Sequence, residues 1–331
     1  MSAPLVNLRE LLVSKIRTSP RKIAVVSLEL TDEEVPSRRS FITEDRHVKI
    51  TADTLSERFC IGPERAKATL KVPTQRGTRS AILPLSCRYK ADRMFNRLRL
   101  GGKFSTNTLW STTRSIINNI ASQVYPHKRG FDATYHMCDA KGDSIGHSLA
   151  GFTSDYGIPN HLTFDGSMVQ TGANTLFMNN IRRSEIKHHV SSPYRPNGNP
   201  AEGSISELKK RLHRIMMKTK IPRRLWDFCL TWVCETGNVT VSSSRYANGR
   251  TPLEIITEET PDITEYLDFA PYDWVVYKSN AGVGAPELER WLGVSNRVGP
   301  LMSYWILPES GIPVSSTTFQ RLTHLEKQTD E

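Results

Sequence analysis

The stretch HHVSSPYRPNGNPAEGSISELKKRL (residues 188–212) carries most of the information about the fold. It begins inside IKHHV (186–190), whose composition predicts a strand. The following SSPYRPNGNPAEG (191–203) is rich in Pro, Gly, Asn and Ser and favours a loop. A long helix then follows, because apolar residues recur at steps of three and four. These residues form one stripe: Ile205, Leu208, Leu212, Ile215 and Met216.

Short apolar and β-branched segments upstream predict further strands. They are KFSTNTLW (103–110), the neighbourhood of ASQVY (121–125), DATYHMC (132–138) and HLTFDG (161–166). Before the last of these, a helix is expected to begin at Asp143 or Ser144 as its N-cap and to end at Gly157. Another helical stretch should end near Arg183, and a packed helix should cover residues 225–233. This order predicts an α/β fold with a mixed sheet.

The regions that flank this block differ from it. Residues 1–50 are polar without periodicity and predict a loosely ordered leader. In residues 51–72, Thr51 is expected to cap a helix that places Leu55 and Phe59 on one face. Gly62 should form a tight turn, and Pro63 should open a second helix. This pair resembles a helix-turn-helix, and both DNA contact and plain helical packing fit the pattern.

Short apolar-aromatic runs separated by Gly, Pro and Asn occupy residues 268–325 and predict a small all-β barrel. The predicted organisation is therefore a leader (1–50), a helix-turn-helix-like module (51–100), an α/β core (101–250), a connector (251–267) and a β-rich tail (268–331).

Length and composition exclude several classes of protein. The chain has 331 residues, of which 38% are hydrophobic and 24% charged, as in ordinary globular proteins. It lacks a run of about 18 apolar residues, so we expect no spanning helix and no membrane partner. The first 22 residues show no apolar signal segment, which predicts a nuclear or cytoplasmic location rather than secretion. Five scattered cysteines are expected to be reduced thiols: Cys60, Cys87, Cys138, Cys229 and Cys234.

The charge is distributed unevenly along the chain. Residues 1–250 hold 39 Lys and Arg against 21 Asp and Glu, whereas residues 251–331 hold 5 against 13. The densest basic stretch, residues 203–224, has eight Lys and Arg and one Glu. Such asymmetry is typical of a polyanion binder. A solvated basic helix face produces the same pattern, and charge alone favours that simpler interpretation.

Two acidic residues stand at the ends of predicted elements, Asp165 after a strand and Glu202 at the start of a helix, with 36 residues between them. Their spacing alone is uninformative, but the residues around them are specific. GIPNHLTFDG (157–166) and residues 188–212 resemble the integrase core of copia-type retrotransposons, which are ribonuclease H-like polynucleotidyl transferases. SSRYANGRTPLEIITEETPDITEYLDF (243–269) resembles the stretch that follows this core in the Pol polyproteins of such transposable elements. The resemblance covers roughly residues 101–325.

The resemblance implies a ribonuclease H-like mixed sheet flanked by helices, a small N-terminal helical module and a C-terminal SH3-like β barrel. It also implies DNA integration, through 3′-end processing and strand transfer by two-metal phosphoryl transfer with Mg²⁺ or Mn²⁺. The implied partners are DNA, both element ends and target, and further copies of the chain that form a homo-oligomer on DNA.

Family members hold the two metal ions with three acidic residues. Asp165 matches the second acid and Glu202 the third, and both are the implied metal ligands. The first acid should lie in the first strand, where this chain has Asn107. An amide cannot supply the negative charge that offsets the repulsion between two dications, so we expect catalysis to be impaired. Three other acids lie too far downstream to replace it: Asp132, Asp139 and Asp143.

In this context, the basic helix is expected to contact DNA phosphates. Lys209 lies two turns from Glu202 and is the best candidate, and Lys210, Arg211 and Arg214 are peripheral ones. Tyr194 and Asn197 could contact DNA from the loop, although turn formation explains them nearly as well.

No zinc site is expected, although copia-type integrases usually carry a His/His/Cys/Cys module. Upstream of the core this chain has only His47, Cys60 and Cys87, which are too few for a closed site. Cys229 and Cys234 are expected to be core thiols, and strand alternation should bury one residue of the pair His188–His189.

Two other functions fit the same sequence. A non-catalytic DNA- or chromatin-binding protein, a remnant or a domesticated integrase fold, would keep the basic surface and tolerate Asn107. A general nuclease of the same fold is less favoured, because the residues around both acids are specifically integrase-like.

Overall fold

A computed structural model describes residues 50–74, 98–192, 199–242, 248–277, 287–296, 303–317 and 319–322. All of them belong to one unit of the chain, Lys49–Leu322. Apart from Ile50, the predicted leader lies outside the described residues, as do Tyr194 and Asn197 of the predicted DNA-binding loop.

The first predicted strand is divided at Thr106 into two strands with different partners. β1 (Arg99–Ser105) pairs in parallel with β5 (Ile158–Asp165), which pairs in parallel with β6 (Lys187–Ser191). β2 (Asn107–Trp110) pairs antiparallel with β3 (Ala121–Pro126), and β3 pairs with β4 (Asp132–Met137). Since one residue separates β1 from β2, the parallel and antiparallel sheets follow each other directly. The predicted mixed α/β architecture is confirmed.

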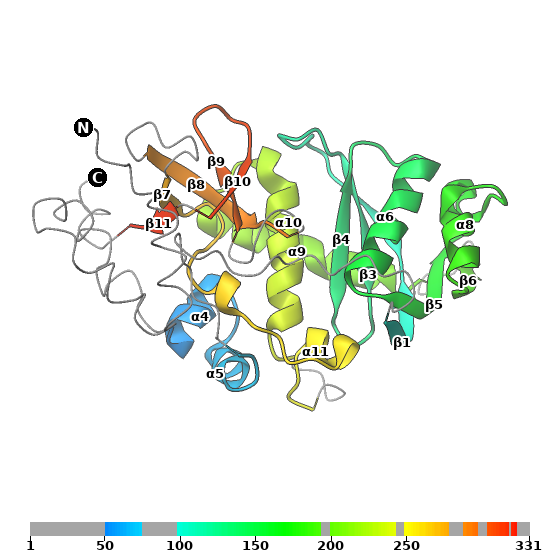
Figure 1. The fold of residues 1–331 in the computed structure, drawn as a ribbon, viewed down its shortest axis with the longest axis horizontal. Coiled ribbons are helices and arrows are strands. Elements are labelled where there is room, and N and C mark those ends of the chain that lie inside the picture. Colours follow the sequence, from blue (N-terminus) through cyan, green and yellow to red (C-terminus); the bar gives the residue numbers. More distant parts are fainter. Residues whose placement is uncertain are drawn as a thin grey trace, which may run out of the picture. The chain divides into compact units, whose positions relative to one another are not determined.

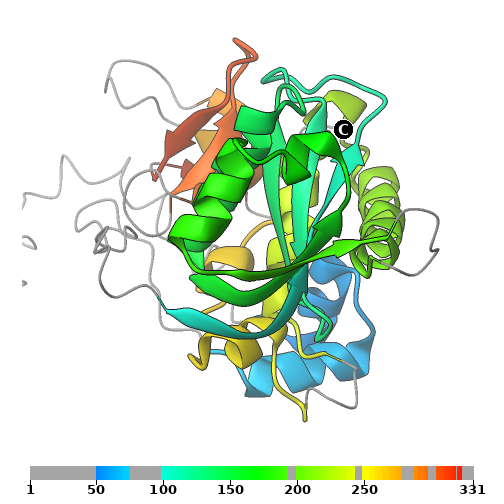
Figure 2. The same cartoon turned by 90° about the vertical axis from the view of Figure 1, so that its right-hand side faces the viewer.

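Helices cover both faces of these strands (Figures 1 and 2). On one face, buried Phe104 and Phe164 share an apolar cluster with residues of α6 (Gly142–Asp155) and α8 (Leu176–Arg183). On the other, Leu109 and Val124 share a cluster with α9 (Ala201–Thr219) and α10 (Trp226–Val239). Because strand side chains alternate between faces, the two clusters lie on opposite sides of the sheet. The remaining short elements of this block are α7 (Met168–Thr171), η2 (Arg223–Leu225), α11 (Pro252–Thr257) and η3 (Thr264–Tyr266).

The predicted apolar stripe of α9 is confirmed. Ile205, Leu208 and Ile215 are buried, and Leu212 and Met216 are half-buried against the same cluster. α10 begins one residue later than predicted and ends at Val239, beyond the predicted limit.

Two local predictions about capping and burial are wrong. α6 begins at Gly142, and its N-cap is Lys141 rather than Asp143 or Ser144. The side chain of Asp139 accepts hydrogen bonds from the Lys141 amide and the Ser144 hydroxyl, so a residue before the helix organises its start. His188 and His189 are both exposed, because β6 is an edge strand with little covering it.

The two predicted N-terminal helices are present as α4 (Ala52–Phe59) and α5 (Pro63–Lys71). Thr51 caps α4 by accepting a hydrogen bond from the Thr54 amide, as predicted. Gly62 is extended, and the left-handed residue of the turn is Cys60, with φ of 52°. Buried Phe59 meets Trp232 of α10 edge to face at 5.7 Å between ring centroids. α4 therefore packs on α10.

The tail forms a five-stranded antiparallel sheet in the order β10-β9-β8-β7-β11. Its strands are β7 (Trp274–Tyr277), β8 (Glu287–Val294), β9 (Tyr304–Leu307), β10 (Val314–Ser316) and β11 (Phe319–Arg321). Closure of this sheet into an SH3-like barrel stays a prediction. The domain boundaries also stay predictions. Trp232 of α10 contacts Phe59 of α4 and, at 5.2 Å between ring centroids, Trp291 of β8, so the predicted core packs directly against both flanking regions. No helix in the described ranges is long and apolar enough to cross a membrane.

Gly157, which ends the α6 turn as predicted, is a site where we expect substitution to destabilise the fold. Its φ is +126°, and an added Cβ would lie 2.4 Å from the Leu98 carbonyl oxygen. Gly157→Ala should therefore lower the free energy of unfolding by about 2 kcal/mol or more, measured by urea denaturation. Gly101→Ala is the control, since nothing lies within 4 Å of its Cβ position, and it should change stability by less than about 1 kcal/mol. Equal effects of the two substitutions would contradict this account.

Candidate active site

The carboxyl ends of the parallel strands bring two predicted site residues together. In the register of β1 and β5, Ser105 pairs with Thr163. The Thr106 amide also donates to the Thr163 carbonyl oxygen at 2.8 Å, so this alignment continues one residue beyond β1. Asn107, the first residue of β2, and Asp165, the last residue of β5, therefore both lie just beyond the end of this pairing. Asp165 is exposed and Asn107 is half-buried.

Asn199 positions the start of α9 at the same edge. Its Nδ2 donates to the Thr106 carbonyl oxygen at 3.1 Å, and its Oδ1 accepts from the Ala201 amide at 3.1 Å. Asn199 is itself buried, and Glu202 is exposed in the first turn of the helix that it holds. Because Leu109 of β2 shares an apolar cluster with Ile205 of α9, Asn107 lies on the sheet face that carries α9. Positions 107 and 165 thus lie at the carboxyl end of the parallel strands, and the start of the helix that carries Glu202 is tied to the same end.

The donor groups at this edge do not fit a pair of divalent metal ions. Asn107 offers only an amide oxygen, which already accepts a hydrogen bond from the Thr108 amide at 2.8 Å. Asp165 likewise accepts from the Gly166 amide at 2.8 Å, although an ionised carboxylate there carries a negative charge that the Asn107 amide lacks. Among the described residues, no group of three or more His, Cys, Asp or Glu side chains is arranged to hold a metal ion. Two carboxylates leave the charge of two dications poorly compensated.

None of the three aspartates considered above, Asp132, Asp139 and Asp143, takes the place of the first acid. Asn107 and Thr134 both pair with Val124, and Asp132 lies two residues before Thr134 on β4. Asp132 therefore lies two strand spacings across and two residues along from Asn107, which is more than about 10 Å. Asp139 holds the start of α6, and Asp143 is exposed in the first turn of that helix.

The predicted DNA-binding residues of α9 differ in their surroundings. Lys209 and Arg214 are exposed, and Lys209 lies on the same helix side as Glu202, about 10 Å along the axis. Lys210 is also exposed and approaches Glu207 at 4.0 Å. Arg211 is half-buried and donates from Nη2 to the Val233 carbonyl oxygen of α10 at 3.0 Å. Arg211 therefore joins two helices, which its place in a basic run does not indicate.

Two of the four described cysteines are buried in the apolar core. Cys229 and Cys234 are buried on α10, as predicted, and burial raises the pKa of both thiols. Cys60 is half-buried and Cys138 is exposed.

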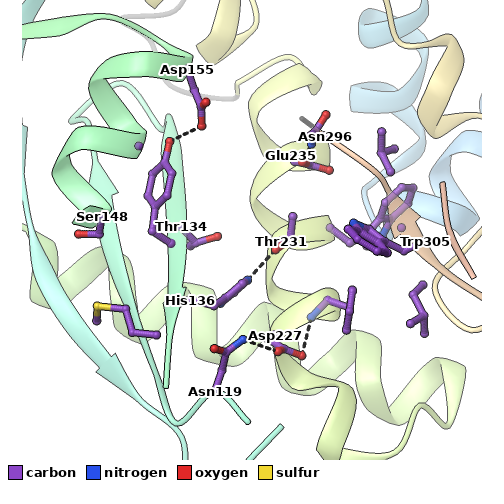
Figure 3. Close-up of a pocket in the computed structure, with 18 of the residues that line it drawn as sticks. Asn119, Thr134, His136, Ser148, Asp155, Asp227, Thr231, Glu235, Asn296 and Trp305 are labelled. Carbon is purple, nitrogen blue, oxygen red and sulfur yellow. Dashed lines mark hydrogen bonds between the residues drawn. The ribbon is translucent and has the colours of Figure 1, made fainter. Parts of the chain in front are cut away.

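A cavity that no sequence motif marks is lined by none of the residues Asn107, Asp165 and Glu202 (Figure 3). It measures about 1120 Å³ and is lined by β4, α6, α10 and the tail strands. His136 of β4 and Thr231 of α10 are hydrogen-bonded at 2.7 Å, and Asn119 donates to Asp227 at 2.9 Å. Burial lowers the pKa of His136, which favours its neutral form. These pairs hold β4 and the β2–β3 connection against α10.

Comparison with solved structures gives similarity to retroviral integrases. No protein-family model matches the chain, and no curated protein matches it in sequence. A chain of the simian T-cell lymphotropic virus intasome, solved in complex with PP2A regulatory subunit B56 gamma, is 14% identical, with 69% of this chain and 84% of that chain covered and a TM-score of 0.38. The HTLV-2 integrase catalytic core domain in complex with magnesium (trimeric form) is 14% identical over 49% of this chain and 99% of its own, with a TM-score of 0.38. The catalytic core domain of BIV integrase is 16% identical over 47% and 93%, with a TM-score of 0.35.

Replacing Asn199 should weaken the attachment of α9 to the sheet. Asn199→Ala leaves the buried Thr106 carbonyl without this donor and the Ala201 amide without its acceptor. We expect a loss of about 1–3 kcal/mol in the free energy of unfolding by urea denaturation. Asn160→Ala, at an exposed position of β5, is the control and should stay within about 0.5 kcal/mol of the wild type. An unchanged midpoint for Asn199→Ala would show that this bridge is unimportant.

Asp132 should make stability depend on pH. Burial raises its pKa to about 7, against an ordinary value of 3.8, and the charge of Arg211 opposes this rise. The folded protein keeps this proton up to about pH 7 while the unfolded chain releases it near pH 4, so the stability contribution falls as the pH rises between these values. Asp132→Asn should therefore be more stable than the wild type by about 1–3 kcal/mol above pH 7 and equal to it near pH 4, measured by urea denaturation at both pH values. A difference that does not change with pH would refute the assignment.

Proposed function

We propose that this chain is a copia-type retrotransposon integrase-like protein whose 3′-end processing and strand transfer are impaired by Asn107. The observation that supports the proposal is that β5 ends at Asp165 beside the end of β1, where Asn199 also ties the start of α9 to Thr106. The resemblance of residues 157–166 and 188–212 to this family supports the same conclusion. The proposed location is the nucleus or cytoplasm.

The impairment follows from charge rather than shape. Asparagine has nearly the size of aspartate, and Asn107 stays within the strand pairing with its amide oxygen on the Thr108 amide. In an intact site, Mg²⁺ or Mn²⁺ would stabilise the attacking and leaving oxygens of the phosphoryl transfer. Asp165 and Glu202 are the carboxylates that would hold the ions, and the amide at position 107 does not bridge two cations.

The DNA partners are proposed to be element ends and target, bound by a homo-oligomer. Exposed Lys209 on the Glu202 side of α9 would bind a phosphate near the reacting end, and the exposed Lys210 and Arg214 would be peripheral phosphate contacts elsewhere on the helix. Tyr194 and Asn197 complete the proposed contacts. We further propose that the N-terminal helices replace the zinc module and that the tail is an SH3-like barrel.

The decisive experiment restores the missing carboxylate. Strand transfer of short duplex ends into a plasmid would be measured in Mg²⁺ and in Mn²⁺ for the wild type, Asn107→Asp and Asn107→Asp/Glu202→Gln. We expect Asn107→Asp to exceed the wild type by about 100-fold or more, equivalent to about 2.7 kcal/mol in the barrier. The double variant is the control and should fall back to the wild-type level, because it again lacks one acid.

The outcomes separate the possible functions. Efficient joining by the wild type would refute the claim that Asn107 is disabling. A gain in Asn107→Asp that Glu202→Gln abolishes would support both the site and its impairment.

A non-catalytic DNA- or chromatin-binding protein is the second candidate. Asn107 favours it, because a binding protein has no need of the first acid. DNA binding by all three proteins without joining by any of them would favour this function over the first.

A further inference from the structure

A pocket lined by arginines lies on the α9 side of the fold, away from the catalytic edge. It measures about 330 Å³ and is bounded by α5, α9 and the C-terminal part of α10. Arg65 of α5 and Arg211 and Arg214 of α9 line it. Arg211 lies nine residues beyond Glu202, about 13 Å along the helix axis.

Backbone contacts fix two of these guanidinium groups. Arg65 donates from Nε to the Val241 carbonyl oxygen at 3.1 Å, and Arg211 donates from Nη2 to that of Val233 at 3.0 Å. α5 is held at the same place by a hydrogen bond from the Val241 amide to Thr69 Oγ1 at 3.0 Å. Gly237 leaves room for Arg211, since a Cβ there would lie 2.8 Å from Nη2. The arrangement is therefore built into the packing of three helices.

These positive charges lack a close acidic partner. In the described parts of the chain, no carboxylate lies within 4.0 Å of the guanidinium nitrogens of Arg65, Arg211 or Arg214. Burial lowers the pKa of the half-buried Arg65, and the positive charge of Arg211 lowers it further. The second effect is the repulsion between the two guanidinium groups. Two carboxylates also line the pocket, those of Asp132 and Glu207. Burial disfavours the charge of Asp132, which interacts with Arg211, and the exposed Glu207 approaches Lys210 at 4.0 Å.

We propose that this pocket binds a phosphate-type oxyanion between Arg65, Arg211 and Arg214. A tetrahedral oxyanion supplies the charge and the acceptors that converging guanidinium groups require. Arg65 and Arg211 each use one N–H on a backbone carbonyl, so four donors on each remain for a ligand. The exposed Arg214 stands at the entrance, and the half-buried Ser204 lines the wall. The ligand is a free phosphate or a phosphate of a nucleic acid. The pocket shares Arg214 with the proposed peripheral DNA contacts, but none of the positions 107, 165 and 202 lines it.

Inorganic phosphate is the probe for this site. Binding to the full chain would be measured by calorimetry and by the shift in Tm, with sodium chloride used to match ionic strength. We expect Arg65→Gln and Arg214→Gln to weaken phosphate binding about tenfold or more. Arg183→Gln, an exposed arginine on α8, is the matched control and should bind phosphate as the wild type does. Because Arg65→Gln also removes a contact between helices, Arg214→Gln provides a variant whose exposed side chain the fold does not need.

Absence of phosphate binding by the wild type, or equal binding by all four proteins, would overturn the proposal. Competition between phosphate and a labelled short DNA duplex identifies the source of the ligand. If phosphate displaces the duplex from the wild type but not from Arg214→Gln, the ligand is a nucleic-acid phosphate. If phosphate binds without displacing the duplex, the ligand is a free anion. Neither result depends on strand transfer, so this site and the proposed function can fail separately.

Discussion

The architecture of the candidate site depends on one fully buried residue, Thr106. Its amide donates to the Thr163 carbonyl of β5 at 2.8 Å, and its carbonyl accepts from Asn199 before α9 at 3.1 Å. Its hydroxyl accepts from Gln123 of β3 at 2.6 Å. A buried polar group without a partner is costly, so all three elements are positioned against the same residue. This junction turns the first strand from a parallel partner to an antiparallel one. It also ties β2, which begins at Asn107, and the start of α9 to the end of β5, where Asp165 lies.

α10 plays the corresponding part for the apolar core. Trp232 in its middle contacts Phe59 of α4, Tyr266 of η3 and Trp291 of β8. Burial of such large rings is the main favourable contribution to folding, and here one helix shares it with the N-terminal helices and the tail. The described segments outside the α/β block therefore fold onto it. The arginine pocket results from this packing, because α5 reaches α9 only by docking on the end of α10.

Shape and charge are separable at the candidate site. Asn107 satisfies strand pairing as an aspartate would, so the fold has no reason to change when the acid is lost. Metal-assisted phosphoryl transfer depends on the charge itself. The same distinction holds among the basic residues of α9. Arg211 is used partly to bind the carbonyl of Val233, whereas exposed Lys209 is free to meet a polyanion.

The sequence determined the features that depend on neighbours along the chain. The apolar stripe of α9, the Thr51 cap and most strand positions follow from local periodicity and local hydrogen bonding, and the structure confirms them. Resemblance identified the positions 107, 165 and 202, but the elements that carry them are tied to the end of the parallel strands by the register of β1 and β5 and the Asn199 bridge. The exposure of both His188 and His189 and the start of α6 were predicted wrongly, because they depend on the sheet edge and on Asp139. The Arg65–Arg211 pocket also depends on tertiary neighbours, so the sequence does not predict it. A helical position fixes a side chain's face, but only tertiary packing decides which distant group lies opposite it.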